Sequence, residues 1–125
     1  MAESRLPHDH GQPIEQKLEN LPDAAGFQMV ADLFKQLADP TRLRIFWLLC
    51  HCEECVINIS SLVGMNSPAV SHHLKLLKSA GLIISRRDGK EVYYKAAGTR
   101  QVQLLHGMIE ALMAITCPAP CPPER

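Results

Sequence analysis

"SPAVSHHLKLLKSAGLIISRRDGKEVYYKA", residues 67–96, is the stretch that decides the fold. Its first half has apolar residues spaced three and four apart and ends at Gly81, which predicts an amphipathic helix over 67–80. Its second half has β-branched and aromatic residues on both sides of Asp88-Gly89, a dipeptide typical of a tight β-hairpin. The stretch therefore predicts a helix with one outward face, followed directly by a hairpin.

Upstream of this stretch, the apolar spacing predicts three further helices. The first spans about Asp23 to Leu37, and the second begins at Pro40, with Asp39 as its N-cap. The third is short and ends at a break over 64–66, after which Ser67 is expected to cap the next helix.

Downstream, a last helix is predicted from about Thr99 to Thr116, because the proline-rich residues that follow cannot continue it. The resulting order predicts a mainly α fold with a small β-hairpin, a winged helix-turn-helix. We expect a flexible N-terminal arm at 1–13, a DNA-binding and dimerisation domain at 14–116, and a Cys/Pro-rich tail at 117–125.

The composition is that of a folded protein outside the membrane. Of the 125 residues, 46% are hydrophobic, and no apolar run approaches the roughly 18 residues that a membrane span needs. Residues 1–16 lack the pattern of a signal peptide, so we expect a cytoplasmic protein with no membrane partner. In that compartment the five cysteines favour metal binding or redox chemistry over a disulfide framework.

The zero net charge hides an uneven distribution. Residues 1–39 carry three basic and seven acidic side chains, a net charge of −4. Residues 67–95 carry six basic and two acidic side chains, a net charge of +4. The basic segment favours a polyanionic partner.

On a helical wheel, the 67–80 helix separates an apolar arc from a small-polar and basic one. His73 lies in the apolar arc, and we expect it to be packed. The outer arc can contact phosphates and base edges in a major groove, while basic side chains at the hairpin tip contact the flanking backbone. The predicted DNA-binding residues are Ser67, Pro68, Ser71, His72, Lys75, Lys78, Arg86, Arg87 and Lys90.

Three segments together resemble the ArsR/SmtB family of winged-helix repressors: "LADPTRLRIFWLL" at 37–49, "SPAVSHHLKLLKSAGLI" at 67–83 and "RRDGKEVYYKA" at 86–96. The resemblance implies a homodimer formed by the first and last helices. It also implies binding to a palindromic operator and release when an inducer, often a metal ion, binds.

The apolar residues of the last helix favour such a dimer independently. They cover about half of the wheel, which is wider than packing on one core requires. These residues are Val102, Leu104, Leu105, Met108, Ile109, Leu112, Met113 and Ile115.

Two inducer sites follow from the resemblance. The family's zinc site on the last helix, Asp-x-His…His-x-x-Glu, is predicted to be absent, because only His106 and Glu110 are present and both are interpreted as polar surface. The family's thiolate site matches at Cys55, but Ile57 replaces its second cysteine.

"CHCEECVINIS", residues 50–60, offers compensating cysteines. If the helix that begins near Pro40 continues through this stretch, Cys50 points into the core. His51, Cys52 and Cys55 then share an outward face, where the two thiolates could bind one ion.

Further ligands are expected from His8 and His10 in the arm, or from Cys117 and Cys121 in the tail. Thiolates with imidazoles favour Zn(II), Cd(II) or Pb(II), whereas three thiolates favour As(III). No organic cofactor is predicted.

The sequence thus predicts a DNA-binding transcriptional repressor that a thiophilic metal or metalloid ion releases from its operator. A thiol redox or persulfide switch on the same fold is the first alternative, and a cytosolic metal-binding protein without a DNA role is the second. No enzyme is predicted, because no catalytic triad, paired-carboxylate or phosphate-loop pattern is present.

Overall fold

The computed structural model describes residues 6–12 and 18–116. The chain divides into two compact units, residues 1–31 and 32–125. In the first unit, the imidazole rings of His8 and His10 stack with their centroids 5.9 Å apart. Helix α2, Ala24–Gln36, begins after Asp23, whose carboxylate accepts a hydrogen bond of 2.9 Å from the backbone N–H of Gly26.

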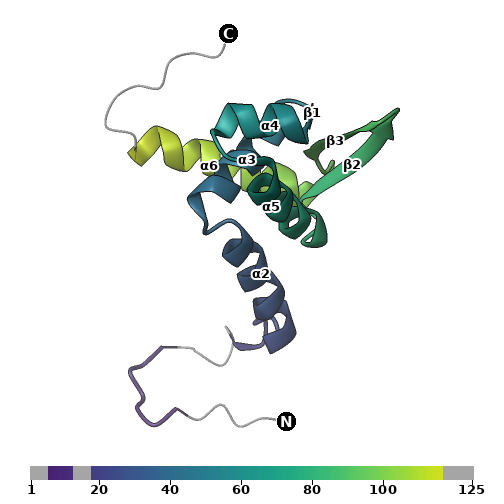
Figure 1. The fold of residues 1–125 in the computed structure, drawn as a ribbon. Helices are drawn as coiled ribbons and strands as arrows, with labels where there is room; N and C mark the ends of the chain where they lie inside the picture. The colour runs from purple at the N-terminus through teal and green to yellow at the C-terminus, as the bar shows by residue number, and fades with distance from the viewer. Residues whose placement is uncertain (1–5, 13–17, 117–125) are drawn as a thin grey trace. The chain divides into compact units, whose positions relative to one another are not determined.

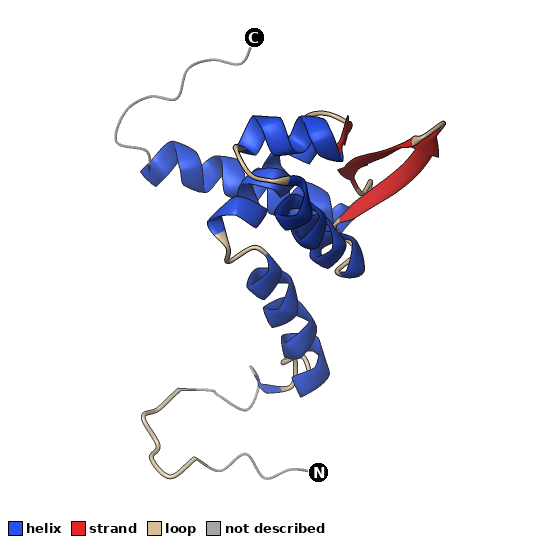
Figure 2. Cartoon of the chain, in the orientation of Figure 1, coloured by secondary structure: helices blue, strands red, loops and turns tan. Residues whose placement is uncertain are grey.

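The second unit holds the other helices and strands of the described residues (Figures 1 and 2). In chain order they are α3 (Pro40–Leu49), β1 (Glu54–Cys55), α4 (Val56–Val63), α5 (Ser67–Ser79), β2 (Ile83–Asp88), β3 (Glu91–Ala96) and α6 (Arg100–Thr116). This is the predicted winged helix-turn-helix, with α4 and α5 as the helix-turn-helix and β2–β3 as the wing. Among the described residues, no helix is both long enough and apolar enough to cross a membrane.

Local sequence determines where the helices begin and end. Asp39 caps α3, as predicted, by accepting a 2.9 Å hydrogen bond from the backbone N–H of Arg42. Gly64 ends α4 in the left-handed region at φ 69°, where a glycine has no steric penalty. The cap of α5 is Asn66, not the predicted Ser67, because the Asn66 side chain accepts from the backbone N–H of Ala69 at 2.8 Å.

The sheet has three antiparallel strands in the order β1-β3-β2. The β2–β3 hairpin turns where predicted: Asp88 pairs with Glu91, and Gly89 adopts φ 66°. Strand β1 was not predicted, and its Cys55 pairs with Tyr93. The prediction that the helix from Pro40 continues through Cys55 is therefore wrong, since α3 ends at Leu49 and the chain turns into the sheet.

One apolar core joins α3, α5, α6 and the start of the wing. The apolar arc predicted for α5 faces this core: Val70, Leu74 and Leu77 are at most 1% exposed. The other fully buried large side chains are Ile45, Phe46, Leu49, Ile59, Leu82 and Ile83. Helix α6 contributes Val102, Leu105 and Ile109.

Helices α2 and α6 each leave apolar side chains exposed. No residue of α2 is buried, and Phe34 is 51% exposed. On α6, Leu104, Met108 and Ile115 are 64%, 41% and 78% exposed, and their spacing places them on one side of the helix. We call these three residues the α6 stripe.

Candidate nucleic-acid interface and metal site

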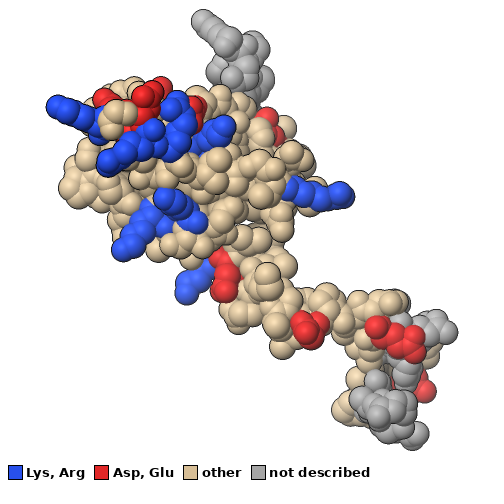
Figure 3. All heavy atoms as spheres, turned by 90° about the vertical axis from the view of Figure 1, so that its right-hand side faces the viewer, with Lys and Arg blue, Asp and Glu red and all other residues tan. Residues whose placement is uncertain are grey.

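The outer face of α5 is exposed and partly basic. Pro68, Ser71, His72, Lys75 and Lys78 are exposed, whereas Ser67 is half-buried and its hydroxyl lies 3.3 Å from that of Ser60. Lys78 donates a 2.8 Å hydrogen bond to Ser85 of β2, so this lysine also connects α5 to the wing. Figure 3 shows Lys and Arg side chains gathered on the side of the molecule where the β2–β3 hairpin lies.

The basic residues of the wing have different surroundings. Arg86 is not at the tip of the hairpin as predicted: it pairs across the sheet with Tyr93, and its guanidinium lies 4.8 Å from the centre of the Tyr93 ring. The same guanidinium donates two hydrogen bonds, of 2.8 and 2.9 Å, to the Glu53 carboxylate. Within the described part of the chain, Arg87 and Lys90 are exposed and form no ion pair.

His73 is packed, as predicted. Its side chain is 14% exposed, its Nε2 lies 3.9 Å from an Asp39 oxygen, and its buried Nδ1 has no hydrogen-bond partner. Burial lowers the pKa of His73, and this outweighs the opposing effect of the Asp39 carboxylate. His73 is therefore a neutral side chain packed at the edge of the interior.

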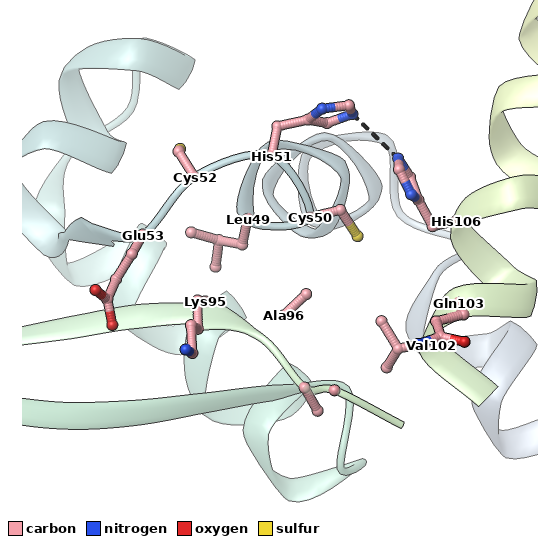
Figure 4. A pocket seen from close by; sticks show the side chains of 12 residues that line it. Leu49, Cys50, His51, Cys52, Glu53, Lys95, Ala96, Val102, Gln103 and His106 are labelled. Carbon is pink, nitrogen blue, oxygen red and sulfur yellow. Dashed lines mark hydrogen bonds between the residues drawn. The ribbon is translucent and has the colours of Figure 1, made fainter. Parts of the chain in front are cut away.

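The cysteines of residues 50–55 point in different directions. Cys50 borders an open hollow of about 400 Å³ between the end of α3, the end of β3 and the start of α6, and its sulfur points toward that hollow (Figure 4). Burial raises the pKa of the Cys50 thiol to about 11, and the Glu110 carboxylate adds to the shift. The prediction that Cys50 faces the core is confirmed in part, because this half-buried residue packs against the core from its edge.

The predicted outward face of His51, Cys52 and Cys55 does not form. Cys52 is half-buried, and its thiol donates to the carbonyl of Leu48 at 3.4 Å. Cys55 lies in β1 and is only 8% exposed. His51 is exposed and lies near α6, away from both thiols, as Figure 4 shows for Cys52.

The predicted outer ligands lie elsewhere in the chain. His8 and His10 belong to the first unit. Cys117 and Cys121 lie outside the described residues. A metal-binding role for these four residues, and for Cys52 and Cys55, stays a prediction.

The structure gives His51 other neighbours. His51 Nε2 lies 3.0 Å from His106 Nε2 and 3.4 Å from Glu110 Oε2. The distance from His106 Nε2 to Glu110 Oε2 is 3.5 Å. The indole N–H of Trp47 donates a 2.7 Å hydrogen bond to Glu110 Oε2. This bond holds the pKa of Glu110 below its ordinary value, so the carboxylate is ionised at neutral pH.

The interpretation of His106 and Glu110 as polar surface missed this cluster. Their separation by four residues did indicate a shared helix face. The sequence could not show that the turn after α3 brings His51 to that face, because the two segments are 55 residues apart.

Comparison with known proteins supports the fold and identifies the family. Residues 39–85 match the family model described as "Bacterial regulatory protein, arsR family". The chain is 36% identical over 85 residues to a "Transcriptional repressor SmtB homolog" of Synechocystis. It is 38% identical over 77 residues to a "Cadmium resistance transcriptional regulatory protein CadC homolog" of Staphylococcus aureus. These matches cover 68% and 61% of this chain, and each spans 64% of the relative's length.

A match to a solved structure covers a larger share of that structure's chain. This structure is the homodimeric winged helix-turn-helix DNA-binding domain of a possible ArsR-family transcriptional regulator from Mycobacterium bovis, a fragment of residues 1–100. The TM-score is 0.65 and the identity 37%, over 74% of this chain and 87% of the solved one. On the strength of the family match and of this structural match, the chain belongs to the ArsR family of bacterial regulatory proteins.

Proposed function

We propose that this chain is a cytoplasmic transcriptional repressor that binds operator DNA as a homodimer and leaves it when a metal ion binds. The observation that carries the proposal is the outer face of α5, where small polar and basic side chains stand exposed on a helix anchored by a fully buried apolar arc. A helix of this kind can enter a major groove and place its N-terminal residues against base edges.

The wing supplies the second set of contacts. Arg87 and Lys90 extend from the hairpin into solvent and can neutralise phosphates beside the major groove. Such contacts position the protein and add affinity, whereas the side chains of α5 read the sequence.

Exposed apolar side chains on α2 and α6 support the dimer. The α6 stripe and, on α2, side chains such as Phe27, Met29 and Phe34 are exposed in the part of the chain that the structure describes. We expect a second copy of the chain to cover these side chains. A palindromic operator has two half-sites and therefore needs two α5 helices related by a two-fold axis.

The inducer is proposed to be a thiophilic metal or metalloid ion among Zn, Cd, Pb and As(III). The names of the relatives support a metal response, one of them being a cadmium resistance regulator. Cys52 and Cys55 stay candidate ligands, although an ion would have to reach Cys55 through a nearly closed surface. An ion that lowers operator affinity must itself bind less tightly to the DNA complex, because the two equilibria are linked.

The redox alternative is less favoured by the thiols themselves. The pKa of Cys50 is about 11, and burial, followed by the Glu54 carboxylate, raises the pKa of Cys52. Since the thiolate is the reactive form, both groups are poor nucleophiles at neutral pH. A metal-binding protein without a DNA role is disfavoured by membership of a family of DNA-binding regulators.

The test measures fluorescence anisotropy with a duplex from the promoter of the chain's own gene. We expect Lys75→Gln to weaken binding about tenfold and to reduce the slope of log affinity against log salt by about 1. Arg100→Gln is the matched control, because it removes the same charge at the start of α6, outside both α5 and the wing.

Metal dependence is measured in the same assay. Adding Zn, Cd, Pb or As(III) to the wild-type complex is expected to release the DNA for at least one ion, and an oxidant is added separately. Equal effects of the Lys75 and Arg100 variants would contradict the proposed interface. Release by oxidant alone would favour the redox alternative.

A further inference from the structure

The cluster of His51, His106 and Glu110 has the donor atoms and the spacing of a metal site. We infer that these three residues bind a borderline divalent cation, Zn(II) in the first instance, and so join the end of α3 to α6 within one protomer. The binding step stands on geometry alone, whereas its regulatory consequence rests on the proposed function.

The distances between the donor atoms fit one ion. The three atoms are 3.0, 3.4 and 3.5 Å apart. One ligand atom from each residue can thus be chosen so that all three lie within 4.8 Å of one another. In a tetrahedral zinc site with bonds of about 2.0–2.1 Å, the ligand atoms are about 3.3–3.4 Å apart. The three side chains thus need only small movements to bind a common ion, with water as the fourth ligand.

Neighbouring groups hold these side chains in place. Trp47 donates to Glu110 Oε2, and its ring packs against the His51 imidazole with centroids 4.4 Å apart. The His51 and His106 rings meet edge to face at 4.8 Å. Such supporting contacts around metal ligands fix their orientation and raise affinity.

The donor set selects the kind of ion. Two imidazoles and one carboxylate suit Zn(II), Co(II) or Ni(II), and the absence of a thiolate among these three residues makes the site unsuitable for As(III). The site is open to solvent, since the Glu110 side chain is 47% exposed and the His51 side chain 31%. An ion can therefore enter without a change of fold.

The position on α6 connects the site to the dimer. On the helix, His106 and Glu110 lie on one side of the buried residues Val102, Leu105 and Ile109, and the α6 stripe lies on the other side. A metal ion would fix the orientation of α6 against α3 and so change how the α6 stripe meets the partner subunit. This would couple metal occupancy to the spacing of the two α5 helices.

The test uses the full-length chain without a polyhistidine tag and without DNA. Trp47 is the single tryptophan of the chain, so its fluorescence reports on the cluster during a Zn(II) titration. We expect one Zn(II) per protomer and a change in emission at saturation. Co(II) should give visible bands without the near-ultraviolet charge-transfer band of a cobalt–thiolate bond.

Two sets of variants assign the ligands. His106→Gln and Glu110→Gln are each expected to lower Zn(II) affinity at least tenfold, while Gln103→Ala, one helical turn away on α6, and the Cys52→Ser/Cys55→Ser double variant retain it. Circular dichroism and thermal unfolding without metal check that each variant folds. The Trp47→Phe variant has no tryptophan fluorescence, so its Zn(II) binding is measured by calorimetry. We expect it to bind Zn(II) several-fold more weakly than the wild type, because it keeps the three ligands but loses the indole N–H donor.

Loss of Zn(II) binding in the cysteine variant, or unchanged affinity in both α6 variants, would overturn the inference. The cluster would then be a hydrogen-bonded polar group only, with one imidazole donating to the other. Operator binding by the metal-free wild-type protein separately tests the proposed function, which can fail while the metal site stands.

Discussion

Arg86 and Arg87 are adjacent in β2, yet their side chains make different contacts. The Arg86 guanidinium is bound to Glu53 by two hydrogen bonds and lies near the Tyr93 ring, while Arg87 extends freely from the opposite face of the strand. A charge that is already paired releases few counterions when a phosphate approaches. We therefore expect the wing to make fewer phosphate contacts than its number of basic side chains suggests.

We accordingly expect Arg87→Gln to lower operator affinity about tenfold and to reduce the salt slope by about 1. Arg86→Gln should lower affinity less and leave the slope nearly unchanged, because Glu53 already neutralises the arginine. Anisotropy titrations at several salt concentrations measure both quantities. A larger loss of slope for Arg86→Gln would show that the ion pair opens on DNA.

His73 makes stability depend on pH in a defined direction. Burial lowers its folded pKa below the unfolded value of about 6.5, so the unfolded chain binds more protons. Above pH 6.5 the imidazole is neutral in both the folded and the unfolded chain, so its titration does not change the free energy of unfolding. As the pH drops through 6.5 toward the folded pKa, the unfolded chain takes up the proton first and the free energy of unfolding falls. The Asp39 carboxylate opposes the shift, while Arg42 and His72 reinforce it.

Urea unfolding of the wild type and of His73→Gln at pH 7.5 and pH 5.5 tests this. We expect the wild type to lose more stability between the two pH values than the variant, which has no titrating group there. The other histidines are common to both proteins and cancel in the comparison. Equal losses of stability in the wild type and the variant would mean that protonation of His73 does not destabilise the folded protein.

At the scale of elements, the start of α5 depends on one side chain. Asn66 accepts the hydrogen bond from Ala69, and Ser67 lies inside the helix with its hydroxyl near Ser60. We expect Asn66→Ala to lower the free energy of unfolding by about 1 kcal/mol. Ser67→Ala is the control and should cost less, and thermal unfolding of both variants shows which residue is the cap.

The elements with strong local patterns were predictable from the sequence. The apolar arc of α5, the Asp39 cap and the hairpin at Gly89 each follow from a few neighbouring residues. Strand β1 was not predictable, because two residues have no periodicity and Glu54–Cys55 becomes a strand only by pairing with β3. The same early end of α3 separates Cys52 from Cys55 and directs His51 to α6, so the error about one element changed the predicted site.

At the scale of the whole molecule, the proposed dimer is expected to depend on the α6 stripe. Leu104→Glu combined with Met108→Glu should convert the dimer into a monomer, because two carboxylates would be buried unpaired at the interface. Sedimentation velocity measures the change, and operator affinity should fall with it. Gln103→Glu adds a charge elsewhere on α6 and should leave the dimer intact, so dissociation of that control would place the interface on another face.

Strand β1 has a mechanical consequence for the DNA-reading part. It ties the start of α4 to the wing through Cys55 and Tyr93, and the Lys78–Ser85 and Glu53–Arg86 contacts add two further ties. We therefore expect the helix-turn-helix and the wing to move together, so that in the proposed dimer an inducer would change the distance between the two DNA-binding units and not the shape of either one. A duplex carrying a single half-site should then bind equally well with and without Zn(II), while the full palindrome loses affinity.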